Sequence, residues 1–231
     1  MVRKTERKRP APLKVLVVDV GGTRVKCLAT GQRTPRELAS GSKLTAEAMV
    51  TGVVDLVRDW SYDVVSIGYP GPVVHDRPLA EPRNLGAGWV KFDYHKAFGK
   101  PVKMINDAAM QALGSYRGGR MLFLGLGTGL GSAMVVDGEL EPMELAHLPY
   151  RKGKTYEDYV GKRGLEKRGK KRWRKDVADV VERLRAAVEA ESVVLGGGNA
   201  KEVKPLPRGV TLGDNANAFI GGFRLWDGAK R

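Results

Sequence analysis

Short apolar runs recur along the chain and predict buried strands. KVLVVDV, residues 14–20, is rich in β-branched residues and is closed by Gly21 and Gly22. RVKCLAT, on the far side of these glycines, alternates apolar and polar residues as a paired strand does. Similar runs predict strands in DVVSIGYPGPV, VKMIN, RMLFLGLGTGLGSAMVV and SVVLGGG. The third of these reads as two strands joined by a glycine-rich turn.

Helical spacing of apolar residues appears between these strands. Residues 45–60 place Met49, Val53 and Leu56 three to four positions apart, with Thr45 as the predicted N-cap. DAAMQALGSY follows the strand VKMIN as a helix, and DVADVVERLRAAVEA predicts an amphipathic helix before SVVLGGG. Because strands alternate with helices along the chain, the predicted fold class is α/β.

Composition limits the class of protein. The 231 residues can bury a sizeable core and leave room for a ligand site between lobes. The longest apolar runs fall far short of the roughly 20 residues that span a bilayer, so no membrane segment is predicted. The basic and then apolar N-terminus mimics a secretory signal, but it carries Asp19 and lacks a cleavage site. A single cysteine, Cys27, argues against a disulfide framework and fits a reducing cytoplasm.

Two short segments carry most of the positive charge. The formal net charge is +14, of which residues 3–9 supply +4 and residues 151–175 supply +9. The stretch EKRGKKRWRK, residues 166–175, also contains a tryptophan. A solvated surface explains many such runs, and nucleic acid is the generic partner of a basic run with an aromatic residue inside it.

Three glycine clusters follow predicted strands: DVGGT at 19–23, GLGTGLG at 125–131 and LGGG at 195–198. Glycine permits unusual turns and lets backbone N–H groups converge on an anion. Tight turns alone would explain one cluster, but three together favour phosphate binding. None of the clusters matches the Walker loop or the G-x-G-x-x-G dinucleotide pattern.

Two aspartates follow or end predicted strands. Asp19 closes an apolar strand, where a carboxylate is costly unless it is paired or coordinates a group such as Mg²⁺ or a phosphate-bound water. Asp107 lies between a strand and a helix, so its structural interpretation is a helix N-cap.

The order of the motifs resembles that of the ROK family of sugar kinases. DVGGTRVK, GYPGPV, NDAA, GLGTGLG, ELAH and VLGGG occur in the family's order, over about residues 14–225. Within the family, the polyphosphate glucokinases are the most similar, because they share YEDYVGKRGLEK and the tryptophan that follows. The resemblance implies a two-lobed actin-like (ribonuclease H-like) α/β fold with a cleft between the lobes. Its expected parts are a basic tail at 1–13, a lobe at 14–109 and a lobe at 110–231, with the final helix packing back on the first lobe.

The resemblance also implies roles for individual residues. Asp107 is the expected catalytic base. The expected phosphate-binding residues are Asp19, Gly21, Gly22, Thr23, Lys26, Gly127, Thr128, Gly129, Gly131, Gly197 and Gly198, with Gly196 beside the last two. The expected sugar contacts are Asn106, Asp107, Glu144, His147, Glu157, Gly71 and Asn84. Ala146 departs from the glycine that many relatives have there, and the cysteine cluster that binds zinc in many relatives is missing, so no structural zinc is expected.

The activity implied by the resemblance is phosphoryl transfer from inorganic polyphosphate, ATP or both to the 6-hydroxyl of glucose or a related hexose. Mg²⁺ is the expected cofactor, held directly or indirectly by Asp19, and the expected state is a cytoplasmic homodimer. The preferred hexose and the main donor stay open. Two alternatives also stay open: a sugar-responsive regulator of the same family, and a sugar-binding protein without catalysis. The regulators carry a DNA-binding domain before the first strand, and only 13 residues precede the first predicted strand here, which disfavours the regulator.

The basic run follows Glu157 by about ten positions and precedes a helix of the predicted phosphate-binding lobe. A long inorganic polyphosphate suits it better than nucleic acid, because a polyphosphate is a polyanion without bases to read. The predicted polyphosphate track consists of Lys167, Arg168, Lys170, Lys171, Arg172 and Arg174.

Overall fold

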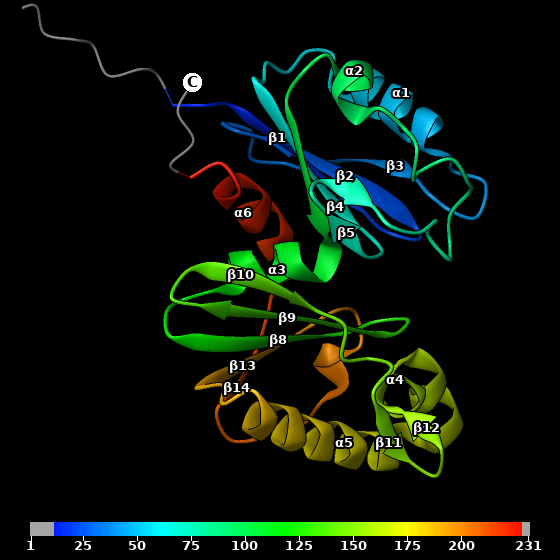
Figure 1. The fold of residues 1–231 in the computed structure, drawn as a ribbon, viewed down its shortest axis with the longest axis vertical. Helices are drawn as coiled ribbons and strands as arrows, with labels where there is room; N and C mark the ends of the chain where they lie inside the picture. The colour runs from blue at the N-terminus through cyan, green and yellow to red at the C-terminus, as the bar shows by residue number, and fades with distance from the viewer. Residues whose placement is uncertain (1–11, 228–231) are drawn as a thin grey trace, which may run out of the picture.

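The computed structural model describes residues 12–227, which form two five-stranded sheets with two helices between them (Figure 1). The predicted α/β class is confirmed. Most of the predicted basic tail, and with it the charged segment 3–9, lies outside the described residues. Within residues 12–227 no helix is both long and apolar enough to cross a membrane.

The N-terminal sheet has the strand order β3-β2-β1-β4-β7. It contains β1 (Val15–Val20), β2 (Arg24–Ala29), β3 (Arg36–Ala39), β4 (Val64–Tyr69) and β7 (Val102–Asn106). The first three strands pair antiparallel, while β4 and β7 run parallel to β1. Helices α1 (Ala46–Leu56) and α2 (Tyr94–Phe98) cover one face. Because the other face is also covered, β1 and β4 are buried along nearly their whole length rather than on alternate residues, and most of their residues are apolar.

The C-terminal sheet repeats this arrangement in the order β10-β9-β8-β13-β14. It contains β8 (Arg120–Leu126), β9 (Leu130–Val136), β10 (Glu139–Met143), β13 (Ser192–Gly196) and β14 (Val210–Leu212). Again three antiparallel strands are followed by two parallel ones. Leu122 and Leu124 face the long helix α5 (Lys162–Ala187), while Met121 and Phe123 face α3 (Asp107–Ser115).

Several short elements were not predicted from the sequence. They are the edge strands β3, β10 and β14, the hairpins β5 (Val73–Val74) with β6 (Arg77–Pro78) and β11 (Pro149–Arg151) with β12 (Lys154–Thr155), and the helices α2, α4 (Tyr156–Val160) and η1 (Ala200–Glu202). These segments are short, and the edge strands β3 and β10 are largely polar, so they carry little periodic signal. The last helix of the described chain is α6 (Asn217–Arg224).

Helix α5 differs from its predicted form. It begins at Lys162 rather than at Asp176, so the basic run is helical, and the backbone breaks the helix at Gly169 with φ 71°. Trp173 is fully buried, and its indole N–H donates to the carbonyl of Val160 at 2.9 Å. This tryptophan cannot stack on a base, which removes the aromatic part of the nucleic-acid interpretation.

Helices α3 and α6 cross between the two sheets at very short range (Figure 1). A Cβ atom on Gly114 would lie 1.8 Å from the carbonyl oxygen of Asn217, and one on Gly221 would lie 1.8 Å from that of Met110. Helix α6 also contacts β1 and β4 of the N-terminal sheet, where the hydroxyl of Ser66 donates to the carbonyl of Gly222 at 2.6 Å. The predicted boundary between lobes, at 109 and 110, falls inside α3, which contacts strands of both sheets.

The glycine contacts at this crossing generate a stability prediction. Gly221→Ala should lower the free energy of unfolding by about 3 kcal/mol, because its methyl group has no space against the backbone of α3. Gly52→Ala, inside helix α1, is the matched control, since a Cβ there would lie at an ordinary contact distance of 3.6 Å from the side chain of Leu38. This control should be neutral or stabilise by up to about 1 kcal/mol through helix propensity. Urea unfolding of both variants measures the difference, and equal effects would contradict the close crossing.

Candidate active site

Asp19 and Asp107 lie at the carboxyl ends of three neighbouring parallel strands. Asp19 on β1 pairs in register with Gly68 on β4, and Gly68 pairs with Ile105 on β7, two residues before Asp107. A Cβ atom on Gly68 would lie 3.6 Å from the Cα atom of Asp107 and 2.3 Å from the methyl carbon of Met110. Gly68, which was not predicted as a site residue, therefore lets helix α3 begin close to Asp19.

The two carboxyl groups influence each other. The pKa of Asp107 is raised to about 7, first because burial disfavours its charged form and then because Asp19 has the same charge. Burial raises the pKa of Asp19 to about 6, and the nearby charge of Lys26, its register partner on β2, opposes the rise. Neither carboxylate forms an ion pair with another residue of the described chain. Such a pair can accept a proton or bind a cation.

Asn106, and not Asp107, is the N-cap of helix α3, so the N-cap interpretation of Asp107 is wrong. The side-chain oxygen of Asn106 accepts from the N–H groups of Ala108 at 2.9 Å and Ala109 at 3.2 Å. Its amide nitrogen donates to the carbonyl of Gly71 at 3.0 Å, which brings a second predicted sugar contact beside Asp107. Asp107 is the first helical residue and accepts one bond, from Ala108 N–H at 2.7 Å. Its carboxylate is held at the helix start, where the helix dipole favours negative charge.

The first glycine turn joins β1 to β2 beside Asp19. The N–H group of Gly21 donates to the carbonyl of Arg24 at 3.0 Å, and a Cβ on Gly21 would lie 2.9 Å from the same oxygen. Gly22 lies against Asn84, whose Cβ would be 3.7 Å from a Cβ on the glycine. The turn and the predicted sugar contact Asn84 are therefore neighbours, with Thr23 exposed between β1 and β2.

The second glycine turn, residues 127–129, is held by the third glycine cluster. The side-chain amide of Asn199 donates to the carbonyl of Gly127 at 3.1 Å, and its backbone N–H donates to that of Leu126 at 2.9 Å. Gly197 has φ 79° and packs on Leu126, with no space for a Cβ. A Cβ on Gly131 would lie 2.7 Å from that of Ala108, so the strand after the turn touches the start of α3. The two glycine clusters and Asp107 thus meet at one place.

Glu157 on α4 reaches the second glycine turn as well. Its Oε2 atom accepts from Leu130 N–H at 3.3 Å, and its backbone N–H donates to the carbonyl of Ala146 at 3.0 Å. The neighbouring pair Glu144 and His147 is exposed, with 4.0 Å between Oε1 and Nε2. The predicted sugar contacts of this lobe therefore come from one loop and the helix beside it.

The predicted polyphosphate track separates into two groups. Arg168 binds the buried Asp176 through two hydrogen bonds of 2.5 and 3.2 Å. Lys170 pairs with the carboxylate of Glu202 at 2.7 Å, and Arg174 donates to the backbone oxygen of Glu202 at 2.6 Å. The other three side chains of the track belong to Lys167, Lys171 and Arg172. They are exposed and form no ion pair or hydrogen bond with any residue between 12 and 227.

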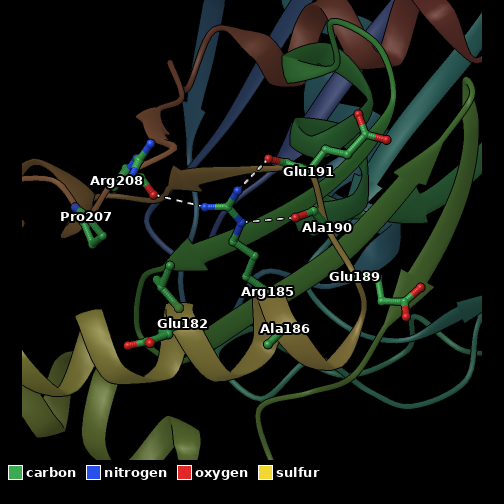
Figure 2. Close-up of a pocket in the computed structure, with 9 residues that line it drawn as sticks. Glu182, Arg185, Ala186, Glu189, Ala190, Glu191, Pro207 and Arg208 are labelled. Atoms are coloured by element: carbon green, nitrogen blue, oxygen red, sulfur yellow. Dashed lines mark hydrogen bonds between the residues drawn. The ribbon is translucent and has the colours of Figure 1, made fainter.

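A cavity of about 650 Å³ lies elsewhere, at the end of α5 (Figure 2). The guanidinium of Arg185 donates to the carbonyls of Ala190, Glu191 and Arg208, so it holds the chain around this cavity together. None of the predicted site residues lines it. Among residues 12–227 no cluster of three or more His, Cys, Asp or Glu side chains is arranged to hold a metal ion by itself.

Comparison with known proteins identifies the family of this chain. The sequence model of the ROK family matches residues 15–142. A polyphosphate glucokinase of Mycobacterium tuberculosis is 26% identical over 207 residues, which cover 80% of this chain and 77% of that protein. The bifunctional enzyme NanE/NanK of Brucella melitensis is 30% identical over 149 residues, 54% of this chain, and the match spans only 27% of that enzyme.

The fold is also that of solved structures. The crystal structure of an inorganic polyphosphate/ATP-glucomannokinase from Arthrobacter sp. strain KM superposes with a TM-score of 0.78 at 23% identity, covering 92% of this chain and 97% of that one. The two-lobed actin-like fold expected from the sequence motifs is confirmed.

The raised pKa of Asp107 generates a prediction for the unliganded protein. Its folded-state value of about 7 exceeds the ordinary 3.8, so the carboxyl group favours folding below pH 4 and this contribution is lost as the pH rises to 7. Asp107→Asn, which is never charged, should therefore raise the free energy of unfolding at pH 8 by on the order of 2–3 kcal/mol and leave it nearly unchanged at pH 4.

Asp59→Asn is the control with the opposite sign, because a hydrogen bond from Arg36 lowers the pKa of Asp59 to about 2. That substitution should destabilise the protein at pH 8. Thermal unfolding at both pH values measures the two effects. A less stable Asp107→Asn variant at pH 8 would contradict an uncompensated charge at this position.

Proposed function

Since the chain belongs to the ROK family, we propose that it transfers a phosphoryl group from inorganic polyphosphate or ATP to the 6-hydroxyl of glucose or a related hexose. The observation that carries this proposal is the carboxyl pair of Asp19 and Asp107, both with raised pKa, beside two glycine turns. Phosphoryl transfer needs a proton acceptor, alignment and charge neutralisation, and these are the groups that could supply them.

Asp107 is the proposed general base. The sugar oxygen forms a bond to the terminal phosphorus of the donor, the bond from that phosphorus to the next bridging oxygen breaks, and the hydroxyl proton passes to the Asp107 carboxylate. The product is a hexose phosphate and a donor shortened by one phosphate. A pKa near 7 suits this task, because the group is ionised in about half of the molecules at neutral pH and is a stronger base than an ordinary aspartate.

Asp19 and the glycine turns are the proposed donor site. A carboxylate without an ion-pair partner matches the oxygen ligands that Mg²⁺ prefers, so Asp19 fits as a group that holds the ion directly or through water. Bound Mg²⁺ would neutralise charge on the donor phosphates. Lys26, Thr23 and the N–H groups of the turns at 21–23 and 127–131, apart from those of Gly21, Gly127 and Leu130, which donate inside the protein, would bind phosphate oxygens. Gly196, Gly197 and Gly198 would adjoin the far end of the donor.

The proposed sugar contacts are side chains with spare hydrogen-bonding capacity. The amide of Asn106 uses one N–H on Gly71 and keeps the second. The carboxylate of Glu157 uses Oε2 on Leu130 and keeps Oε1. Glu144 and His147 are exposed beside it, and Asn84 would contact the sugar from the N-terminal lobe.

Within the basic run, the three unpaired cations Lys167, Lys171 and Arg172 are the proposed contacts for a long polyphosphate. Binding there would release counterions and would weaken as salt increases. Arg168, Lys170 and Arg174 have partners inside the protein, so their main contribution is to hold α5 in place. The N-terminus of α5 bonds the second glycine turn through Lys162 N–H, which connects the run to the donor site.

A phosphorylation assay tests the proposed function. A panel of hexoses is crossed with ATP and long-chain polyphosphate, and at least one hexose should be phosphorylated on its 6-hydroxyl. Asp107→Asn should lower kcat by at least about 10³-fold while the hexose still binds, because the variant lacks the proton acceptor but keeps the shape of the site. Absence of turnover with every pair would favour a sugar-binding protein or regulator, and an active Asp107→Asn variant would overturn the mechanism.

Charge reversal tests the polyphosphate contacts. The triple variant Lys167→Glu, Lys171→Glu and Arg172→Glu should raise KM for long-chain polyphosphate about 10-fold or more at low salt and flatten its salt dependence, with KM for ATP changed less than about 3-fold. The control reverses Lys91, Lys96 and Lys100, which carry the same charge near α2 on the other lobe (Figure 1). Equal losses with both donors, or in both triple variants, would refute the assignment.

A further inference from the structure

The junction between α4 and α5, residues 157–162, is fastened to the second glycine turn at several points. Lys162 N–H donates to the carbonyls of Gly127 at 3.1 Å and Thr128 at 3.2 Å. A Cβ on Gly161 would lie 3.0 Å from the Thr128 oxygen and 3.3 Å from the Cα atom of Gly129. At the other end of the junction, Glu157 accepts from Leu130 N–H at 3.3 Å. The turn cannot shift without moving this junction.

The carboxylate of Glu157 occupies the space beside Gly129. A Cβ atom on Gly129 would lie 2.1 Å from Oε2 and 2.8 Å from the carboxyl carbon. A side chain at position 129 would therefore displace the carboxylate of Glu157, whereas the backbone angle sets no such limit, because the φ of Gly129 is not in the left-handed region. The neighbouring Gly127 differs, since nothing lies within 4 Å of its Cβ position.

We propose that Glu157 is a positioning residue that couples the sugar site to the donor turn. One carboxylate oxygen binds the turn through Leu130 N–H, and the other is available to a sugar hydroxyl, an assignment that rests on the proposed function. A sugar that fixes the carboxylate also fixes the turn on which the donor phosphates bind. Sugar binding therefore tightens donor binding, and by linkage donor binding tightens sugar binding by the same factor.

The first experiment needs no ligand. Hydrogen exchange of the Leu130 amide is measured in the unliganded protein and in two variants. Glu157→Ala removes the acceptor, so exchange at Leu130 should become at least about 5-fold faster. Glu157→Gln keeps an acceptor oxygen and should retain most of the protection. Exchange that is unchanged in Glu157→Ala would overturn the proposed contact whatever reaction the protein catalyses.

The second experiment measures the coupling by titrating long-chain inorganic polyphosphate with and without 6-deoxyglucose. This sugar lacks the hydroxyl that would be phosphorylated, so both ligands bind without turnover. In the natural protein 6-deoxyglucose should lower the Kd of polyphosphate by about 5-fold or more, and in Glu157→Ala the ratio should fall to about one.

Gly129→Ala tests the same route without altering Glu157. Its methyl group would push the carboxylate from Leu130, so the coupling ratio should also fall to about one. The double variant Gly129→Ala with Glu157→Ala should lose no more coupling than either single variant, because both changes break the same contact, between Glu157 and Leu130 N–H. Gly127→Ala is the matched control in the same turn and should keep the natural coupling ratio, whatever it does to donor affinity.

The outcomes separate this inference from the proposed function. Suppose that a hexose is phosphorylated. A coupling ratio of one in the natural protein, or an unchanged ratio in Glu157→Ala, would then refute the coupling and leave the activity standing. If no hexose is phosphorylated and 6-deoxyglucose does not bind, the proposed function fails and the coupling fails with it. A ratio that falls equally in Gly127→Ala and Gly129→Ala would show a general effect on the turn and would also refute the role of Glu157.

Discussion

The pair of like-charged carboxyl groups at Asp19 and Asp107 is the constraint on which the arrangement of this protein depends. Burial raises the pKa of both groups, and the charge of Asp19 raises that of Asp107 further, so the folded chain holds them together against an electrostatic penalty. The parallel strands β1, β4 and β7 bring their carboxyl ends to one edge, and Gly68 leaves space for α3 to begin there. Apolar packing of α3 against α6 and both sheets has to supply the stability that this site consumes.

Close approach at glycine is the common device of the structure. Gly114 and Gly221 let α3 and α6 cross with their backbones in contact, Gly131 lets β9 touch the start of α3, and Gly129 leaves space for Glu157. In each case a methyl group would overlap another atom, so the contact depends on the missing side chain rather than on a turn. The glycines therefore connect the two sheets, the donor turn and the sugar side of the proposed site into one packed unit.

The basic run combines a structural role with a proposed binding role. Arg168 spans the break at Gly169 and neutralises the buried Asp176, while Lys170 and Arg174 tie α5 to Glu202 next to the third glycine cluster. These contacts orient the helix so that Lys167, Lys171 and Arg172 remain exposed to solvent. A run that reads as uniform charge in the sequence thus contains cations with different partners and different expected effects on substitution.

Local patterns in the sequence were sufficient for the central strands, for helices α1 and α3 and for the glycine turns, because apolar periodicity and strand ends are properties of neighbouring residues. The expectation that Asp19 and Asp107 act in one site came instead from the resemblance of the motif order to the ROK family. The polar edge strands stayed hidden, since pairing with a distant strand defines them. The sequence could not decide whether Asn106 or Asp107 caps α3, because the two residues are adjacent and both types favour the N-cap position. The partners of Arg168, Lys170 and Glu157, the burial of Trp173 and the spacing role of Gly68 were decided by the tertiary structure alone, because each depends on atoms that only folding brings together.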